Sequence, residues 1–488
     1  MGGKIRKFFF EHRNPRQIVA KNFLWLTAGE FSSRLIRAFV MIYAARILGA
    51  HGYGVFSYIL DLAGFFTIFS SVGISFMLTR DMSQQPEKRY EFFATTFFIR
   101  IVLLVLSLLL LVVAAPLFSR VEGGRPLFVF AALLVAFDGF RDLSSAVFRA
   151  FERMEFEALT SGVTNITIAC VALLAIVFVP TPYALTISYV SGAGVGALLG
   201  IFLLRNWFRK IFTHFRKELV LPILKTASAI LLASFFGPFM LQIDTIMLGW
   251  WKGVAEVGRY AAAQRIIFLL LVLPDILSLT IFPMLSRLVK EGNAARLQAL
   301  VERAFSVLFA IALPLLLGGV ILASPLLLFL YGEEYVSSAL TLQILLLTLF
   351  WLFPRGVVYN IVLAHDRRFV MASSAALGAV TNVILNVILI PRYGGAGSAI
   401  ATFCAVCVNR GLIFREARRL QKFSTFRLLP KVIIASLAGP GLMSYILLLF
   451  HVHVLLIILL SALFYFLILI LLRAPIVEEF RAFFRQAT

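Results

Sequence analysis

Charged residues are scarce in this sequence, and cysteine is scarcer still. Asp, Glu, Lys and Arg make up 14% of the 488 residues, against 61% hydrophobic residues, which is far from the composition of soluble globular proteins. The three cysteines, Cys170, Cys404 and Cys407, all fall within apolar runs. There we expect small buried hydrophobes rather than a disulfide or a metal site. The composition indicates a membrane protein with many spans.

The chain also lacks the motifs that bind nucleotides or catalytic metals. It contains no GxxxxGK[ST] phosphate loop, no HExxH, no clustered His and Cys and no Gly-rich nucleotide motif. Direct ATP drive and metal catalysis therefore have no visible site, and we expect no cofactor, with coupling to Na+ or H+ left open. The formal net charge is +21, but the basic residues lie in short loops, where they set topology rather than bind nucleic acid.

Apolar runs bounded by charge, Gly or Pro predict about fourteen transmembrane helices. Their expected ranges are 22–48, 53–79, 91–119, 126–150, 157–180, 183–205, 221–250, 256–286, 301–323, 335–363, 369–391, 394–415, 430–450 and 453–473. We expect a protein of the cell membrane. Because Lys and Arg concentrate in alternate loops, the positive-inside rule places both of its termini in the cytoplasm. No loop is long enough for a folded domain.

Three short matches indicate that the first six spans are repeated in the next six. FMLTR at Phe76–Arg80 corresponds to PMLSR at Pro283–Arg287, and AFER at 150–153 corresponds to AHDR at 364–367. VTN at 163–165 recurs as VTN at 380–382, and the three offsets are 207, 214 and 217 residues. Repeats of six spans keep one orientation, so they predict two bundles related by a pseudo-two-fold axis, with the substrate path between them.

The expected fold is thus all-α, with two six-helix bundles and two further helices. The segment 1–21 is basic and lacks the apolar core of a signal peptide, so we expect it on the cytoplasmic surface. The remaining predicted parts are the first bundle 22–207, a cytoplasmic linker 208–220, the second bundle 221–418, a second linker 419–429, a lipid-facing two-helix unit 430–473 and a cytoplasmic tail 474–488.

Several segments of the chain resemble one transporter family. These segments are AARILGAHGYGVFSY from Ala44, DTIMLGWW from Asp244, EVGRYAAAQRI ending at Ile266, FLYGEEY from Phe329 and NVILNVILIPRYGGAGSAIAT from Asn382. They are similar to the Wzx-type flippases for oligosaccharides and polysaccharides, whose superfamily also contains the MATE drug exporters.

The resemblance implies transport of a polyprenyl-pyrophosphate-linked oligosaccharide from the cytoplasmic to the outer leaflet. It also implies that the protein contacts membrane lipid and that its partners are the glycosyltransferases and polymerase of a surface polysaccharide pathway.

Charges inside the spans mark the candidate binding site, because each costs about 2.5 to 3.5 kcal/mol near the centre of a membrane. Arg34 and Arg37 share one helical stripe with Glu30, and Arg265 lies in span eight. Given the resemblance, we expect Arg34, Arg37 and Arg265 to hold the pyrophosphate, since guanidinium groups bind phosphate through two parallel hydrogen bonds. Arg355, nearer the cytoplasmic mouth, is a further candidate. Arg100 is another, unless it reaches the lipid headgroups.

Buried carboxylates in the spans are candidates for ion coupling, because they can bind Na+ or carry a proton. The candidates are Glu30, Asp61, Asp244 and Asp275. Asp61 and Asp244 could equally be structural partners of Arg37 or Arg259, and that alternative stays open.

Other polar and small residues favour structural roles. We expect Asp138, Arg141 and Asp142 to hold helices together, and Asn382 and Asn386 to do so through hydrogen bonds. Gly192, Gly196 and Gly200 form a repeated GxxxG face for close helix packing.

Two other function classes compete with a flippase. A cation-coupled exporter of small drugs from the same superfamily would need an acidic cleft, whereas Arg outnumbers the carboxylates on the facing spans. An integral membrane glycosyltransferase or glycan polymerase commonly needs an acidic catalytic site or a large outer loop, and the sequence shows neither clearly.

Overall fold

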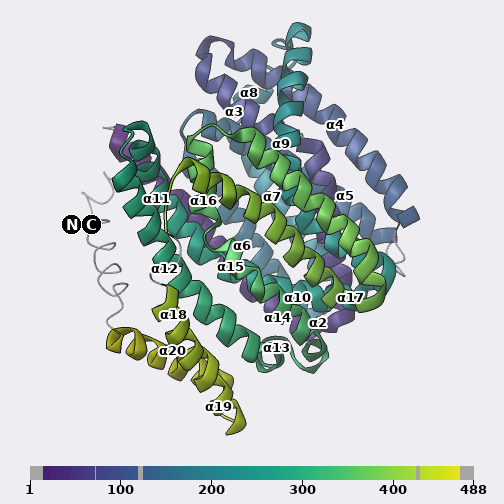
Figure 1. The fold of residues 1–488 in the computed structure, drawn as a ribbon. Coiled ribbons are helices and arrows are strands. Elements are labelled where there is room, and N and C mark those ends of the chain that lie inside the picture. The colour runs from purple at the N-terminus through teal and green to yellow at the C-terminus, as the bar shows by residue number, and fades with distance from the viewer. Residues whose placement is uncertain (1–14, 72, 119–124, 425–428, 473–488) are drawn as a thin grey trace, which may run out of the picture. The chain divides into compact units, whose positions relative to one another are not determined.

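The computed structural model describes residues 15–71, 73–118, 125–424 and 429–472, and every regular element in these ranges is helical (Figure 1). The side chains of 15–36, 114–118, 125–126, 228–234, 279–280, 283 and 429 lie outside the description. Two predicted site residues, Glu30 and Arg34, therefore have no described side chain, and the predicted tail 474–488 lies outside as well. Helices are the expected elements, because backbone groups in lipid must be satisfied within their own segment.

Contacts divide the chain into two compact units, Met1–Gln242 and Ile243–Thr488. Unit 1 contains α2 (Pro15–Ser71), α3 (Ile74–Gln84), η1 (Pro86–Lys88), α4 (Arg89–Phe118), α5 (Arg125–Ala150), α6 (Met154–Phe178), α7 (Pro182–Leu203), α8 (Arg205–Phe208) and η2 (Lys217–Leu219). Its core is made where α2, α5, α6 and α7 pack against one another. Helix α9 (Val220–Lys252) runs through the boundary between the units.

Unit 2 continues with a second set of helices. They are α10 (Val254–Leu270), α11 (Val272–Lys290), α12 (Ala294–Ile321), α13 (Ala323–Tyr331), η3 (Glu333–Ser338), α14 (Ala339–Leu347), α15 (Leu349–Leu352), α16 (Arg355–Ala364), α17 (Arg368–Leu420), α18 (Leu429–Ser436), η4 (Leu437–Met443), α19 (Ser444–Leu449) and α20 (Val454–Leu471).

Two helices are interrupted by a glycine. In α17, 53 residues long, Gly394 has φ 55° and ψ −132°, and in α2 Gly49 has φ 66° and ψ 177°. A straight helix of that length would be about 80 Å long, against a hydrocarbon core of about 30 Å. Glycine adopts positive φ at little cost, so each break divides a long helix into two segments. In α17 the two segments match the predicted spans 369–391 and 394–415, whereas the predicted span 53–79 is divided between the end of α2 and the start of α3.

Ten helices in the described part of the chain are long and apolar enough to cross a membrane, judged by length and composition. Two of these ten candidate helices lie in the interrupted α2 and α17. Each of these two long helices extends over two predicted spans. Helices α5 and α9 are not among the ten, but they occupy the predicted spans 126–150 and 221–250. The chain is therefore an all-α membrane protein with helices where the apolar runs predicted them.

Glycines bring α7 close to its neighbours, as the GxxxG pattern predicted. A methyl group on Gly192 would collide with Ile168 of α6, and one on Gly196 would collide with the Thr164 hydroxyl. One on Gly200 would lie 2.8 Å from the Ser144 hydroxyl of α5. Only a residue without a side chain fits at these contacts.

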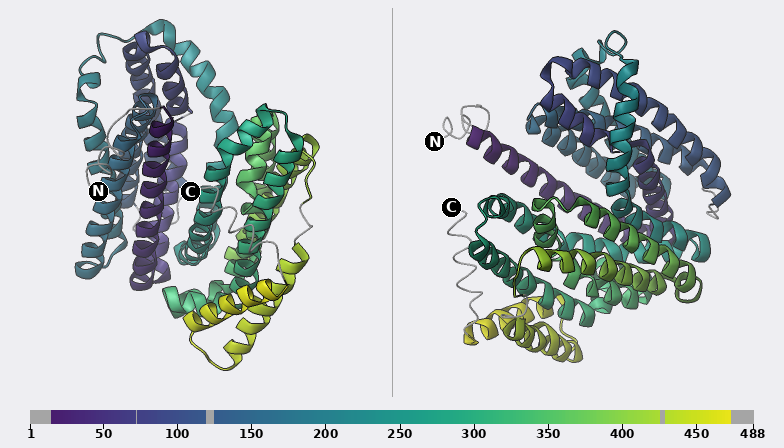
Figure 2. Two further views of the ribbon diagram at one scale, coloured as in Figure 1. Left: turned by 90° about the vertical axis from the view of Figure 1, so that its left-hand side faces the viewer. Right: turned by 45° about the horizontal axis from the view of Figure 1, so that its top comes forward.

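The last helices pack on α12 (Figure 2, in yellow). The Tyr465 hydroxyl of α20 donates to the Ala310 carbonyl at 2.7 Å, and Gly318 of α12 lies against Pro440 of η4. Most of the large apolar side chains of α20 remain exposed, as expected of a unit that faces lipid.

One prediction about cysteine is wrong. Cys170 is exposed on α6, whereas Cys404 and Cys407 are partly buried on α17. All three are free. The apolar run around Cys170 reflects an outer face of the helix rather than a buried one, because lipid-facing and core-facing positions of a span are both apolar.

Candidate functional site

A buried carboxylate surrounded by neutral donors forms an enclosed polar site in unit 2. Asp244 of α9 is 1% exposed. Its Oδ1 accepts hydrogen bonds from the side-chain amides of Asn382 at 3.0 Å and Asn386 at 2.6 Å. Its Oδ2 accepts from the hydroxyls of Tyr260 at 2.8 Å and Thr402 at 2.5 Å. We call these five residues the Asp244 cage.

Positions on three helices build the cage. Asn382 and Asn386 are one turn apart before the Gly394 break in α17, and Thr402 follows the break, so both halves of α17 contact the same carboxylate. Tyr260 comes from α10. The predicted helix-tying role of the two asparagines is confirmed by these bonds. Tyr260 and Thr402 were not predicted as site residues, although both lie in the segments that carry the family resemblance.

The cage supplies hydrogen bonds to the buried Asp244 carboxylate but no positive charge to balance it. Among the described residues, Asp244 has no cationic partner, and Arg259 pairs with Glu256 at 2.9 Å instead. The alternative in which Asp244 pairs with Arg259 is therefore wrong. Four hydrogen bonds satisfy the oxygens, but no described cation balances the carboxylate, and such a group can take up a proton or a cation.

The donor set also fits a small cation. The side-chain oxygen of Asn386 is buried and has no hydrogen-bond partner in the described part of the chain. Rotation of either amide by half a turn would present oxygen in place of nitrogen. Carboxylate, amide and hydroxyl oxygens are the ligands that hard cations take, and the cage holds all three.

A second charged site in unit 2 is an ion pair between α16 and α11. Arg355, the first residue of α16, places its Nη2 2.6 Å from Oδ1 of Asp275 on α11. The side chains are 28% and 30% exposed, so both remain accessible. The two helices approach closely here, because a methyl group on Gly356 would collide with Ser278. Asp275, predicted as an ion-coupling candidate, is thus an ion-pair partner of a predicted substrate residue.

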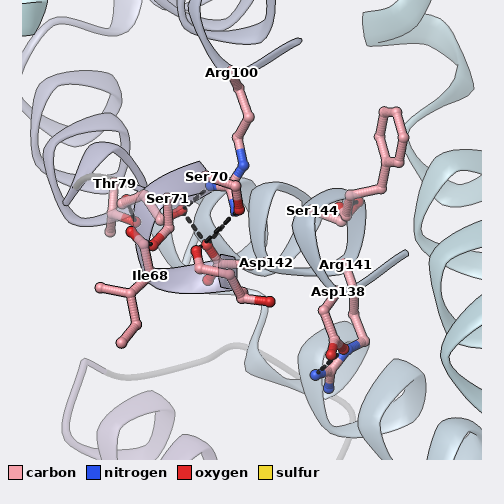
Figure 3. A network of polar contacts seen from close by, with 12 residues as sticks. Ile68, Ser70, Ser71, Thr79, Arg100, Asp138, Arg141, Asp142 and Ser144 are labelled. Carbon is pink, nitrogen blue, oxygen red and sulfur yellow. Dashed lines mark hydrogen bonds and ion pairs between the residues drawn. The ribbon is translucent and has the colours of Figure 1, made fainter. Parts of the chain in front are cut away.

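Arg100 belongs to a polar network within unit 1 (Figure 3). It is 3% exposed, and its Nη2 lies 2.9 Å from Oδ2 of Asp142 on α5. Its Nη1 donates to the Ser75 hydroxyl of α3 at 2.7 Å, and that hydroxyl donates to Asp142 at 2.5 Å. Asp138 pairs with Arg141 at 2.9 Å. Asp142 therefore holds α5 to α3 and α4, as predicted, and Arg100 shares this role, whereas the Asp138–Arg141 pair lies within α5.

The other predicted site residues with described side chains lie on α2 and α10. Arg37 is exposed on α2 and Asp61 is partly buried on the same helix, whereas Arg265 is partly buried on α10. Arg37 belongs to unit 1 and Arg265 to unit 2. Their joint contact with a pyrophosphate stays a prediction.

Comparison with known proteins identifies the family. Residues 19–289, more than half of the chain, match the family model described as polysaccharide biosynthesis protein. Residues 229–388 also match the MatE family model. Among curated relatives, the "Probable flippase AglR" of Haloferax volcanii is 25% identical over 401 residues, covering 78% of this chain and 79% of that protein.

One further relative is similar over most of its length, and one solved structure has a similar fold. A protein of Shigella flexneri provisionally named an O-antigen transporter is 21% identical and covers 81% of this chain and 96% of its own length. The solved structure titled lipid II flippase MurJ, in an inward closed conformation, superposes with a TM-score of 0.72 at 16% identity, covering 92% of this chain and 99% of that one. The chain therefore belongs to the polysaccharide biosynthesis protein family, a family of multi-pass membrane transporters rather than enzymes, within the superfamily that includes the MATE proteins.

Proposed function

We propose that this protein is a flippase that moves a polyprenyl-pyrophosphate-linked oligosaccharide from the cytoplasmic to the outer leaflet for surface polysaccharide biosynthesis. Membership of the family and the names of its relatives support transport of a lipid-linked glycan. The pathway's glycosyltransferases and polymerase would supply and consume the substrate.

The observation that carries the proposal is the accessible cationic side chains on the spans of unit 2. Arg265 and Arg355 are partly buried on α10 and α16, within predicted membrane spans, where charge is costly. A pyrophosphate crossing the bilayer needs such counter-charges, and guanidinium supplies two parallel hydrogen bonds to each phosphate. Arg34 and Arg37 would contribute from the first span. Arg100, held by Asp142 and Ser75, would act indirectly by fixing α3, α4 and α5.

The proposed architecture has fourteen spans in two six-helix bundles, 22–207 and 221–418, with the unit 430–473 added. The proposed linkers are 208–220 and 419–429, and both termini lie in the cytoplasm. The bundles would move against each other in alternating access, while the polyprenyl tail remains in lipid.

The Asp244 cage is the proposed coupling site. Its enclosed carboxylate would exchange a proton or Na+ as the bundles move, and the ion would be shared among the carboxylate, amide and hydroxyl oxygens of the cage. Glu30, Asp61 and Asp275 are weaker candidates, the last because it already pairs with Arg355.

A cation-coupled drug exporter is the second candidate, because the MatE match spans Asp244, Asn382 and Asn386. The two functions differ in the charge of the substrate, and accessible arginines favour an anionic one.

Expression in a strain that lacks its own lipid-linked glycan flippase separates the two functions. We expect the wild-type chain to restore surface glycan while leaving resistance to cationic drugs unchanged. Drug resistance without restored glycan would instead establish the exporter.

A further inference from the structure

A second arginine, Arg410, approaches Arg355 where α15 and α16 pack on α17. The ring of Trp351 on α15 lies 6.2 Å from that of Phe414 on α17, so the two helices are in contact at these positions. Arg355 follows Trp351 by four residues and Arg410 precedes Phe414 by four. The contacts of α15 and α16 with α17 therefore bring Arg410 near Arg355 and Tyr359. Arg410 was not among the predicted site residues.

The charges at this interface do not balance. Asp275 pairs with Arg355 at 2.6 Å. Arg410 has no hydrogen bond or ion pair with any group in the described part of the chain. Two guanidinium groups and one carboxylate leave a net positive charge on spans where each charge costs a few kcal/mol. A partly buried, unpaired cation on a membrane span is typical of a functional site.

Unit 1 shows that the fold itself does not require the second arginine. Arg141 precedes Arg355 by 214 residues, the offset of the AFER and AHDR match, and it also has an aspartate partner, Asp138. A methyl group on Gly196 would lie 3.5 Å from Cδ of Arg141, so α7 packs there as α17 packs near Arg355. The stretch 193–197 of α7 reads Ala-Gly-Val-Gly-Ala and carries no charge. The extra cation is specific to unit 2.

We propose that Arg355 and Arg410 together bind a phosphate or pyrophosphate group, with Tyr359 as an additional donor. Two guanidinium groups on adjacent helices offer paired N–H donors to separate oxygens of one oxyanion. Asp275 competes with the anion for Arg355. When the anion leaves, the Asp275 carboxylate takes its place as the partner of Arg355. Assignment of the anion to the lipid-linked substrate rests on the proposed function, whereas anion binding itself does not.

Binding of inorganic pyrophosphate to the purified full-length protein in phosphatidylcholine nanodiscs tests the site. We expect Arg410→Gln and Arg355→Gln each to weaken binding about tenfold or more, the equivalent of one charged hydrogen bond. Arg410→Lys should bind at an intermediate level, since it keeps the charge without the fork, and it remains informative if the Gln variant fails to accumulate. Arg392→Gln, which removes an exposed charge from the same helix, should bind as the wild type does. Equal affinity of Arg410→Gln and Arg392→Gln, or no binding by the wild type, would overturn the site.

Two further arms identify the source of the anion and separate this proposal from the flippase. If lipid headgroups occupy the site, phosphatidylglycerol in the nanodiscs should weaken pyrophosphate binding in Arg392→Gln and leave the residual binding of Arg410→Gln unchanged. If only a lipid-linked pyrophosphate occupies it, phosphatidylglycerol should have no effect on either variant. Pyrophosphate binding that depends on Arg410, with no restored export in cells, would uphold the site and refute the flippase. Restored export with binding independent of Arg410 would do the reverse.

Discussion

The unusual feature of Asp244 is its carboxylate, which is buried without a cationic partner among the described residues. A carboxylate with four neutral donors is fully hydrogen-bonded yet unneutralised, so removal of the charge should relieve a desolvation cost. The sequence could predict Asp244 as a candidate, because charge in an apolar run stands out. It could not predict Thr402, because a neutral hydroxyl 158 residues away becomes significant only when the helices pack.

Asp244→Asn should therefore accumulate and unfold at the same temperature as the wild type or higher, while transport is lost. The hydroxyls of Tyr260 and Thr402 can reverse their donor roles to suit an amide, so the cage survives the change. Thermal unfolding of the purified variant and surface glycan in cells provide the two readouts. Asp366→Asn, at an exposed carboxylate, serves as the control and should export normally. Normal export by Asp244→Asn would exclude a coupling role.

At the scale of helices, hydropathy predicted where the elements lie, because apolar runs of adequate length must be helical in lipid. The breaks at Gly49 and Gly394 could be anticipated only as turns between spans, since helix continues on both sides of each glycine. Which face of a span is buried was harder to predict, as Cys170 shows, because lipid and protein both accept apolar side chains. Close glycine contacts are the exception, since the GxxxG spacing carries the information itself.

Gly196→Ala tests that helix contact. The added methyl group would collide with the Thr164 hydroxyl, so we expect destabilisation by about 1 to 3 kcal/mol, as for overpacked cores. Gly162→Ala on the neighbouring α6 meets nothing within 4 Å and should be neutral or slightly stabilising. Thermal unfolding in one detergent compares the two variants. Equal stability would show that α6 and α7 are not in close contact at this point.

For the whole molecule, the loop charges predict which loops face the cytoplasm. Helix packing alone does not determine this orientation in the membrane. Cysteine labelling in intact cells tests it. Cysteine at Glu333, in η3 between α13 and α14, should react with a membrane-impermeant reagent. Cysteine at Arg209, an exposed residue after α8, should react only after permeabilisation, because basic loops stay in the cytoplasm. The reversed pattern would invert the proposed direction of transport.

Leaflet exchange in proteoliposomes tests the central claim most directly. The vesicles would contain a fluorescent polyprenyl-pyrophosphate-linked oligosaccharide, and an impermeant quencher would report the fraction in the outer leaflet over time. We predict that the wild-type protein lets the quencher reach nearly all of the lipid. Arg265→Lys should be slower, because the charge remains without the fork, and Arg265→Ala should match protein-free vesicles at equal protein content. Wild-type vesicles that retain an unquenched inner-leaflet fraction equal to that of protein-free vesicles would contradict the proposed flippase activity.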